Sequence, residues 1–168
     1  MKSQRILGAL ATTLYFGHYL LTVTDWHFID NANLIFHEAG HTIFFFLGEF
    51  IQVAMGSGFQ IAVPLLCAAY FLSRRDFFSA SILGAWVGQN IINVSLYAKD
   101  AVIMQLPLLG GDAAGHDWNY LLSETNLLQH TDAIAYGMQT LGALVILFSF
   151  AVMWYCAFNQ KEQTNSAT

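Results

Sequence analysis

Two histidines and a glutamate lie inside an apolar stretch of the chain, in the order His37-Glu38-Ala39-Gly40-His41. Residues four apart on a helix share one face, so a helix here would offer both imidazoles to one ion. The flanking residues 34–36 and 43–47 are aliphatic or aromatic. Polar and charged groups in such a stretch must be neutralised, paired or bound to a metal. The stretch therefore predicts a helix packed against polar partners, with a metal site on one face.

The His-Glu-x-x-His pattern is typical of a zinc site. Zinc binds imidazole nitrogens at about 2.0–2.1 Å and prefers a tetrahedral set of ligands. Glu38 would lie beside the ion, where it can take a proton from the attacking water and pass it to a leaving amine. A catalytic zinc has three protein ligands and one open position, so a third ligand must come from another part of the chain.

His116 is the first candidate for the third zinc ligand, because it lies among glycines that let the backbone approach closely. Asp117 would then orient His116 through a hydrogen bond. Asp112 is the alternative, since it is also flanked by glycine and could bind zinc through a carboxylate oxygen. Weaker candidates are His27 and His130.

Two asparagines, Asn90 and Asn93, lie three residues apart in the apolar segment 77–98 and would share one face of a helix. They could form hydrogen bonds between helices. Alternatively, one of their amides could bind the backbone of a substrate or orient a metal ligand. The pattern leaves both interpretations open.

The composition indicates an integral membrane protein. Hydrophobic residues make up 56% of the chain and charged residues 10%, whereas soluble domains carry about 25% charged residues. Apolar runs over 6–23, 77–98 and 132–157 are long enough to cross a bilayer. We therefore expect an all-α polytopic bundle of four to five spans, with residues 1–158 in one membrane-embedded domain and residues 159–168 as a disordered polar tail.

The segment after the motif decides between four and five spans. The motif helix is expected to weaken at Gly48-Glu49, and Gly56-Ser57-Gly58 should break the helical pattern. The run 60–72 is short and contains Pro64, so we expect a re-entrant segment. Arg74 and Arg75 would then lie on the side of the N-terminus, as the positive-inside tendency favours. This topology predicts cytoplasmic termini and a zinc site in the outer half of a bacterial cytoplasmic (inner) membrane.

The charge balance limits the possible partners. Eleven acidic residues outweigh six basic ones, and no basic tract indicates binding to nucleic acid. The expected partners are the lipid bilayer and a membrane protein or peptide that serves as substrate. The oligomeric state cannot be predicted from these patterns.

The motif His37–His41 in an apolar helix, followed by Gly48 and by Gly56-Ser57-Gly58, resembles the site-2 protease family of intramembrane zinc metalloproteases. The resemblance implies that Glu38 is catalytic and that a later motif of Asn, Pro and Asp-Gly type supplies an aspartate as third ligand. Its nearest match here is the segment 106–112, in which the aspartate follows the glycines rather than preceding them. The resemblance covers residues 30–60 well and 90–118 poorly, which leaves His116 and Asp112 both open.

Two functions follow from these patterns. The first is an integral membrane zinc-dependent endopeptidase that cleaves peptide bonds in or near the membrane, with zinc held by His37, His41 and His116. The alternative is a metal-binding membrane protein without hydrolase activity, such as a carrier, a scaffold or an inactive relative. The same histidines would serve in both, so only the role of Glu38 distinguishes them.

Overall fold

A computed structural model describes residues 2–106 and 115–159, and its regular elements over these ranges are all helical. The predicted all-α class is thereby confirmed. Two helical segments, Glu49–Ser73 and Leu128–Phe158, are long and apolar enough to cross a membrane, so a bundle of four to five spans stays a prediction. In chain order the elements are α1 (Lys2–Leu21), α2 (Phe28–Ile43), η1 (Phe45–Leu47), α3 (Glu49–Ser73), α4 (Phe77–Lys99), α5 (Asp117–Glu124), η3 (Leu128–His130) and α6 (Thr131–Phe158).

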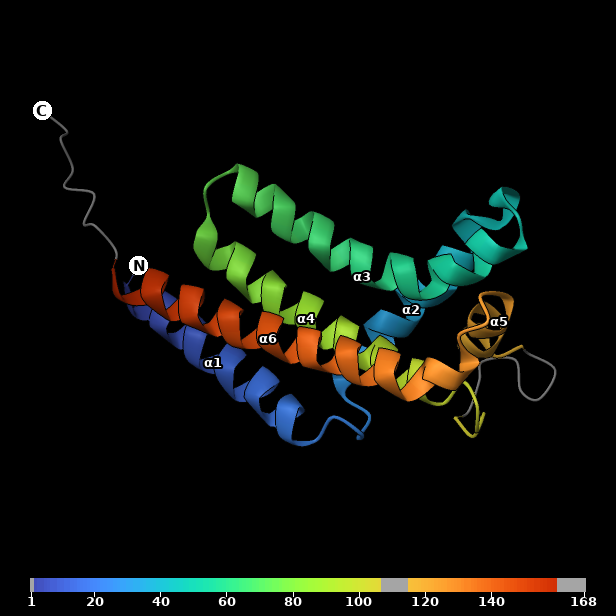
Figure 1. Cartoon of the computed structure of the whole chain (residues 1–168). Coiled ribbons are helices and arrows are strands. Elements are labelled where there is room, and N and C mark those ends of the chain that lie inside the picture. The colour runs from blue at the N-terminus through green and yellow to red at the C-terminus, as the bar shows by residue number, and fades with distance from the viewer. Residues whose placement is uncertain (1, 107–114, 160–168) are drawn as a thin grey trace, which may run out of the picture.

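Helices α1, α3, α4 and α6 run along one long axis of the molecule, and α4 packs closely against α6 (Figure 1). At their crossing, a Cβ on Gly88 or on Gly142 would lie 2.6 Å from the carbonyl oxygen of the other glycine. Small residues at such a crossing let two helical backbones touch. The apolar core beside this contact includes Tyr19, Ile92 and Ile146.

The two ends of the bundle differ. The start of α1, the turn between α3 and α4, and the end of α6 lie together at one end (Figure 1). The guanidinium of Arg5 lies 5.4 Å from the ring centre of Phe78, which joins the first turns of α1 and α4 there. The short helix α5 lies at the opposite end, and α2 lies in the half of the molecule next to it. Helices α2 and α5 thus lie away from the end that holds Arg5.

The predicted re-entrant segment is wrong, because α3 continues as one helix of 25 residues through Gly56-Ser57-Gly58 and Pro64. The break lies earlier: α2 ends at Ile43, and Gly48 has a φ of 90° before α3 begins. That φ is in the left-handed region that glycine adopts without strain. The glycines at 56 and 58 therefore do not act as helix breakers here.

Two other predictions fall outside the residues that the structure describes. One is Asp112 as an alternative metal ligand, which lies in the stretch 107–114. The other is the polar tail, of which only Asn159, at the end of α6, is described.

Candidate metal centre

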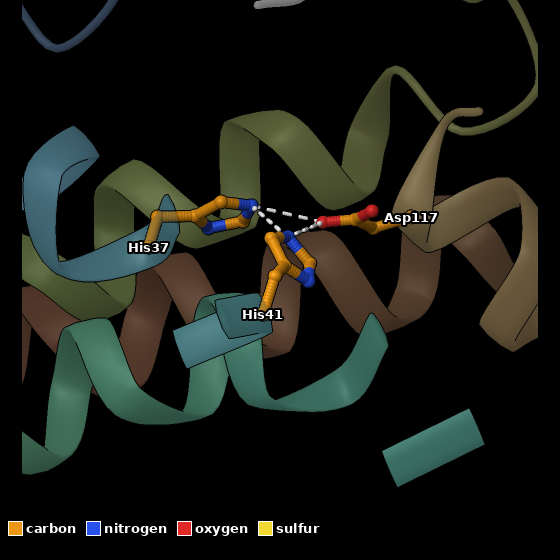
Figure 2. A group of neighbouring side chains, drawn as sticks. All are labelled: His37, His41 and Asp117. Atoms are coloured by element: carbon orange, nitrogen blue, oxygen red, sulfur yellow. Dashed lines mark hydrogen bonds and ion pairs between the residues drawn. The ribbon is translucent and has the colours of Figure 1, made fainter. Parts of the chain in front are cut away.

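Three side chains meet at one point between α2 and α5 (Figure 2). His37 Nε2 lies 3.1 Å from His41 Nε2 and 2.9 Å from Asp117 Oδ2, and His41 Nε2 lies 3.1 Å from the same carboxylate oxygen. Ligand atoms on a tetrahedron with bonds of about 2.0–2.1 Å would lie roughly 3.3 Å apart. The group could therefore hold a metal ion after a small outward shift of its three atoms.

The buried face of α2 explains why both histidines reach this point. Asp30, Asn33, His37 and Gly40 are buried and recur at intervals of three and four residues, which is the spacing of one helix face. His37 and Gly40 on this face lie against α3, whereas Asp30 and Asn33 form hydrogen bonds with side chains of α4. A Cβ on Gly56 of α3 would lie 2.5 Å from His41 Nε2, so glycine at this position leaves room for the imidazoles.

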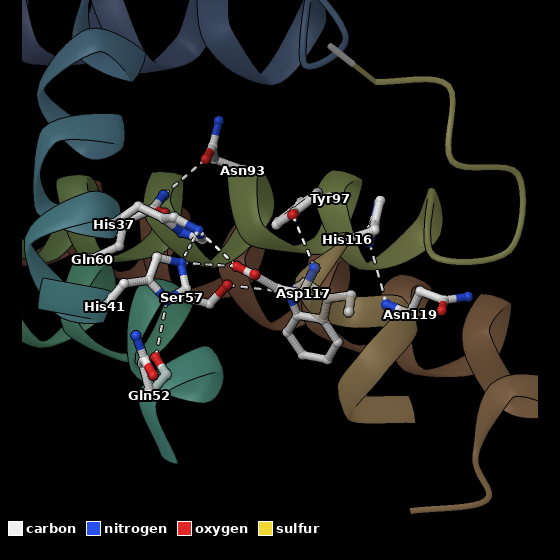
Figure 3. Close-up of polar contacts among 11 residues, drawn as sticks. His37, His41, Gln52, Ser57, Gln60, Asn93, Tyr97, His116, Asp117 and Asn119 are labelled. Atoms are coloured by element: carbon white, nitrogen blue, oxygen red, sulfur yellow. Dashed lines mark hydrogen bonds and ion pairs between the residues drawn. The ribbon is translucent and has the colours of Figure 1, made fainter. Parts of the chain in front are cut away.

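The Nδ1 atoms of both imidazoles already have hydrogen-bond partners (Figure 3). His41 Nδ1 lies 3.0 Å from the main-chain carbonyl oxygen of Gln52, which can only accept a hydrogen bond, so Nδ1 carries the proton. His37 Nδ1 lies 3.3 Å from the side-chain oxygen Oε1 of Gln60 and donates in the same way. The lone pairs of both Nε2 atoms then face each other and a carboxylate. Three acceptor atoms at such short distances repel one another unless a proton or a metal cation lies between them.

Hydrogen bonds from the backbone of Asp117 and from the next side chain hold this residue in place. Its N–H donates to the hydroxyl oxygen of Tyr97 (3.1 Å), and the neighbouring Trp118 indole donates to Ser57 Oγ on α3 (3.1 Å). Burial alone would raise the pKa of the Asp117 carboxyl. Without a metal, a proton on the Nε2 side of the imidazoles lets His37 and His41 donate to this carboxylate, which outweighs burial and holds the pKa below its usual value. The carboxylate is therefore ionised at neutral pH, the form that binds metal.

The three side chains open into a cavity of about 680 Å³. Glu38, the glutamate of the motif, lines the same cavity and is exposed. Apolar side chains form much of the wall, including Val23, Leu34 and Val94. A carboxylate that could act as a base thus faces the same space as the metal-binding atoms.

His116 does not join the two histidines, in contrast to the prediction. It is the residue before α5, where its Nδ1 accepts a hydrogen bond from the backbone N–H of Asn119 (3.2 Å) and its Nε2 lies 3.3 Å from Asp100 Oδ2. Because the helix begins at Asp117, that residue turns its carboxylate toward α2 instead. Asp117, predicted only as the partner of His116, takes the place expected of the third ligand.

The two predicted asparagines differ in position. Asn93 lines the cavity and accepts a hydrogen bond from Gln60 Nε2 (2.8 Å), which links it to His37. Asn90 is fully buried and donates to the main-chain carbonyl of Trp86 (3.0 Å), one turn earlier in α4. Asn93 thus has a partner near the site, whereas Asn90 bonds to its own helix.

Sequence reasoning missed Gln60, Tyr97 and Asp30 as neighbours of the centre. The signal for Asp30 was present, since it precedes His37 by seven residues, two helical turns along the same face. No local pattern pointed to Gln60 or Tyr97, because α3 and α4 bring them in from elsewhere in the chain.

Comparisons of this chain with family models, with curated proteins and with solved structures find no match. The interpretation of the centre therefore depends on its own geometry and chemistry.

Proposed function

We propose that this protein is an integral membrane zinc-dependent endopeptidase that cleaves peptide bonds in or near the membrane. One observation carries the proposal: the two Nε2 atoms of His37 and His41 and the carboxylate of Asp117 converge in a cavity that Glu38 also lines. Two imidazoles with one carboxylate, and an open side toward a cavity, form a donor set used by catalytic zinc sites. The resemblance of residues 30–60 to site-2 proteases, which use an aspartate as third ligand, supports the same assignment.

The surface of the helices supports a membrane location. Large apolar side chains on α1, α3 and α6 are more than half exposed, and examples are Leu14, Leu66 and Phe148. Many exposed apolar side chains along several helices are unfavourable in water and favourable in lipid. Besides the two apolar segments long enough to cross, we propose that α1 and α4 also span the bilayer and complete a four-helix bundle.

Each side chain has a distinct role in this proposal. His37, His41 and Asp117 would bind the zinc ion, which when bound polarises a peptide carbonyl as a Lewis acid. Glu38 would take a proton from the attacking water and deliver it to the leaving amine. The largely apolar wall of the cavity would accept an extended segment of a membrane protein or peptide.

Replacing Glu38 by Gln tests the protease mechanism. The Glu38→Gln variant should retain zinc at the wild-type stoichiometry, because Glu38 is not among the three metal-binding side chains. Turnover should fall by at least about a hundredfold, the usual effect of losing a general base. Zinc content by elemental analysis and cleavage of a panel of membrane-protein substrates are measured on the same preparations, with His37→Ala as the variant that should lose zinc.

Two outcomes would contradict the proposal. Cleavage by Glu38→Gln at the wild-type rate would show that this carboxylate is not the base. Stoichiometric zinc in the wild-type protein without cleavage of any substrate in the panel would favour the alternative, a metal-binding membrane protein without hydrolase activity.

A further inference from the structure

A chain of hydrogen bonds runs from Asp30 to His37 through two side-chain amides. Asp30 Oδ1 accepts a hydrogen bond from Asn93 Nδ2 (3.1 Å), and Asn93 Oδ1 accepts one from Gln60 Nε2 (2.8 Å). Gln60 Oε1 in turn accepts from His37 Nδ1 (3.3 Å). Asp30 and Gln60 are each 3% exposed and His37 is 7% exposed, whereas Asn93 between them is half-buried at the wall of the cavity. The chain of hydrogen bonds thus passes from α2 to α4, then to α3, and returns to α2.

The carboxylate of Asp30 fixes the direction of every bond in this chain. All of its contacts are N–H donors, and the other three are the backbone of His27 (2.7 Å), Asn33 Nδ2 (3.3 Å) and Gln89 Nε2 (2.8 Å). An ionised carboxylate can only accept, so Asn93 must turn its nitrogen toward Asp30 and its oxygen toward Gln60. Gln60 must then present its oxygen to His37. His37 Nδ1 therefore carries the proton, and its Nε2 keeps a lone pair for the metal.

We propose that Asp30 is a positioning residue for the metal centre, a buried charge that sets the tautomer and orientation of His37 through Asn93 and Gln60. Partners that accept the second N–H of a metal-bound histidine orient the ring and raise its basicity. Here the group that accepts from His37 is the side-chain amide of Gln60. The charge of Asp30 reaches this amide through two further hydrogen bonds, by way of Asn93. The inference depends on the proposed metal centre but not on peptide cleavage.

The two histidines of the motif are therefore supported differently. His41 donates to a main-chain carbonyl, which no side-chain substitution can remove, whereas His37 depends on three side chains outside the motif. Substitutions in the chain should weaken the metal site through His37 alone. A purely architectural network would instead lower the stability of the bundle and leave the metal affinity of the folded protein unchanged.

The test is a titration of the purified full-length protein in detergent with Co²⁺, whose visible absorption reports both binding and coordination geometry. Asp30→Asn should lower the affinity for Co²⁺ by about ten- to a hundredfold, the usual effect of losing a group that orients a metal ligand. Asp25→Asn is the matched control, because Asp25 lines the same cavity and loses the same charge but lies outside the chain of hydrogen bonds. Its affinity should stay close to that of the wild-type protein.

A double variant tests the direction of the chain. Asp30→Asn combined with Gln60→Glu moves the negative charge next to His37 Nδ1. Asn93 can then reverse its amide, with its nitrogen toward residue 60 and its oxygen toward residue 30, which is no longer a carboxylate. Affinity for Co²⁺ should recover toward the wild-type value. Gln60→Met breaks the chain at the link beside His37 while leaving Asp30 all four of its donors, so it should reproduce the loss even if Asp30→Asn fails to fold.

The outcomes separate this inference from the proposed function. Wild-type Co²⁺ affinity in folded Asp30→Asn or Gln60→Met, or a double variant that does not recover, would overturn the role of Asp30. An equal loss in Asp25→Asn would overturn it as well, since the effect would then be one of general charge. Metal binding without any peptide cleavage by the wild-type protein would overturn the protease function and leave the role of Asp30 intact.

Discussion

At the scale of single residues, the centre depends on which of two neighbours turns toward α2. His116 has an extended backbone and precedes α5, whereas Asp117 is the first residue of that helix. The sequence pattern predicted this short segment as the source of the third ligand. It could not tell the two residues apart, because the choice depends on where the helix begins and how it docks through Trp118 onto Ser57.

Serine at position 116 or 117 tests whether His116 or Asp117 completes the metal site with His37 and His41. Asp117→Ser should abolish stoichiometric zinc binding, because it removes the carboxylate that contacts both histidines. His116→Ser should keep zinc, since Ser is a good residue before a helix and can accept the hydrogen bond from Asn119 that His116 now accepts. Zinc content of the two purified variants is the measurement, and loss of zinc from His116→Ser with retention by Asp117→Ser would reverse the assignment.

At the scale of elements, the motif helix was predictable and its neighbour was not. The spacing of His37 and His41 correctly predicted a helix with both imidazoles on one face. By sequence alone, Gly56-Ser57-Gly58 predicts a break in the helical pattern, because glycine is unfavourable inside an isolated helix, yet α3 continues through these residues. The physical reason for Gly56 lies across the α2–α3 interface, where the imidazoles occupy the space of a side chain. Such a reason cannot be seen in a local pattern.

Gly56→Ala tests this interface. An added Cβ would lie 2.5 Å from His41 Nε2 and 2.8 Å from His37 Nε2, so the rings must move from the positions that face Asp117. We expect at least about a tenfold loss of zinc affinity, similar to that for other changes that misplace a metal ligand. Alanine is the better helix former, so α3 itself should not be weakened.

Gly58→Ala is the matched control for Gly56→Ala, two residues along the same helix. Its nearest neighbour would be the sulfur of Met55 at 3.3 Å, the end of a flexible side chain that can move. Zinc affinity measured by competition with a chelator should be close to wild type for Gly58→Ala. Equal affinities for the two variants would show that the imidazoles do not need the space at residue 56.

At the scale of the whole molecule, the basic residues and the metal centre lie toward opposite ends. The start of α1 and the α3–α4 turn share one end of the bundle (Figure 1). They carry four of the five basic residues in the described ranges, namely Lys2, Arg5, Arg74 and Arg75. Lys99, at the end of α4, is the exception. If the bundle crosses a membrane, the positive-inside tendency favours the basic end in the cytoplasm and the metal centre toward the outer side.

Cysteine labelling of intact cells tests this orientation. In a variant whose native Cys67 and Cys156 are replaced by Ser, a single cysteine is placed at Glu124, at the end of α5, or at Ser73, at the end of α3; both positions are exposed. Glu124→Cys should react with an impermeant maleimide added outside, because α5 lies at the end with few basic residues. Ser73→Cys should react only after the membrane is permeabilised. The opposite pattern would place the metal centre on the cytoplasmic side, and equal labelling of both positions in intact cells would show that the helices do not carry the two ends to different sides of a membrane.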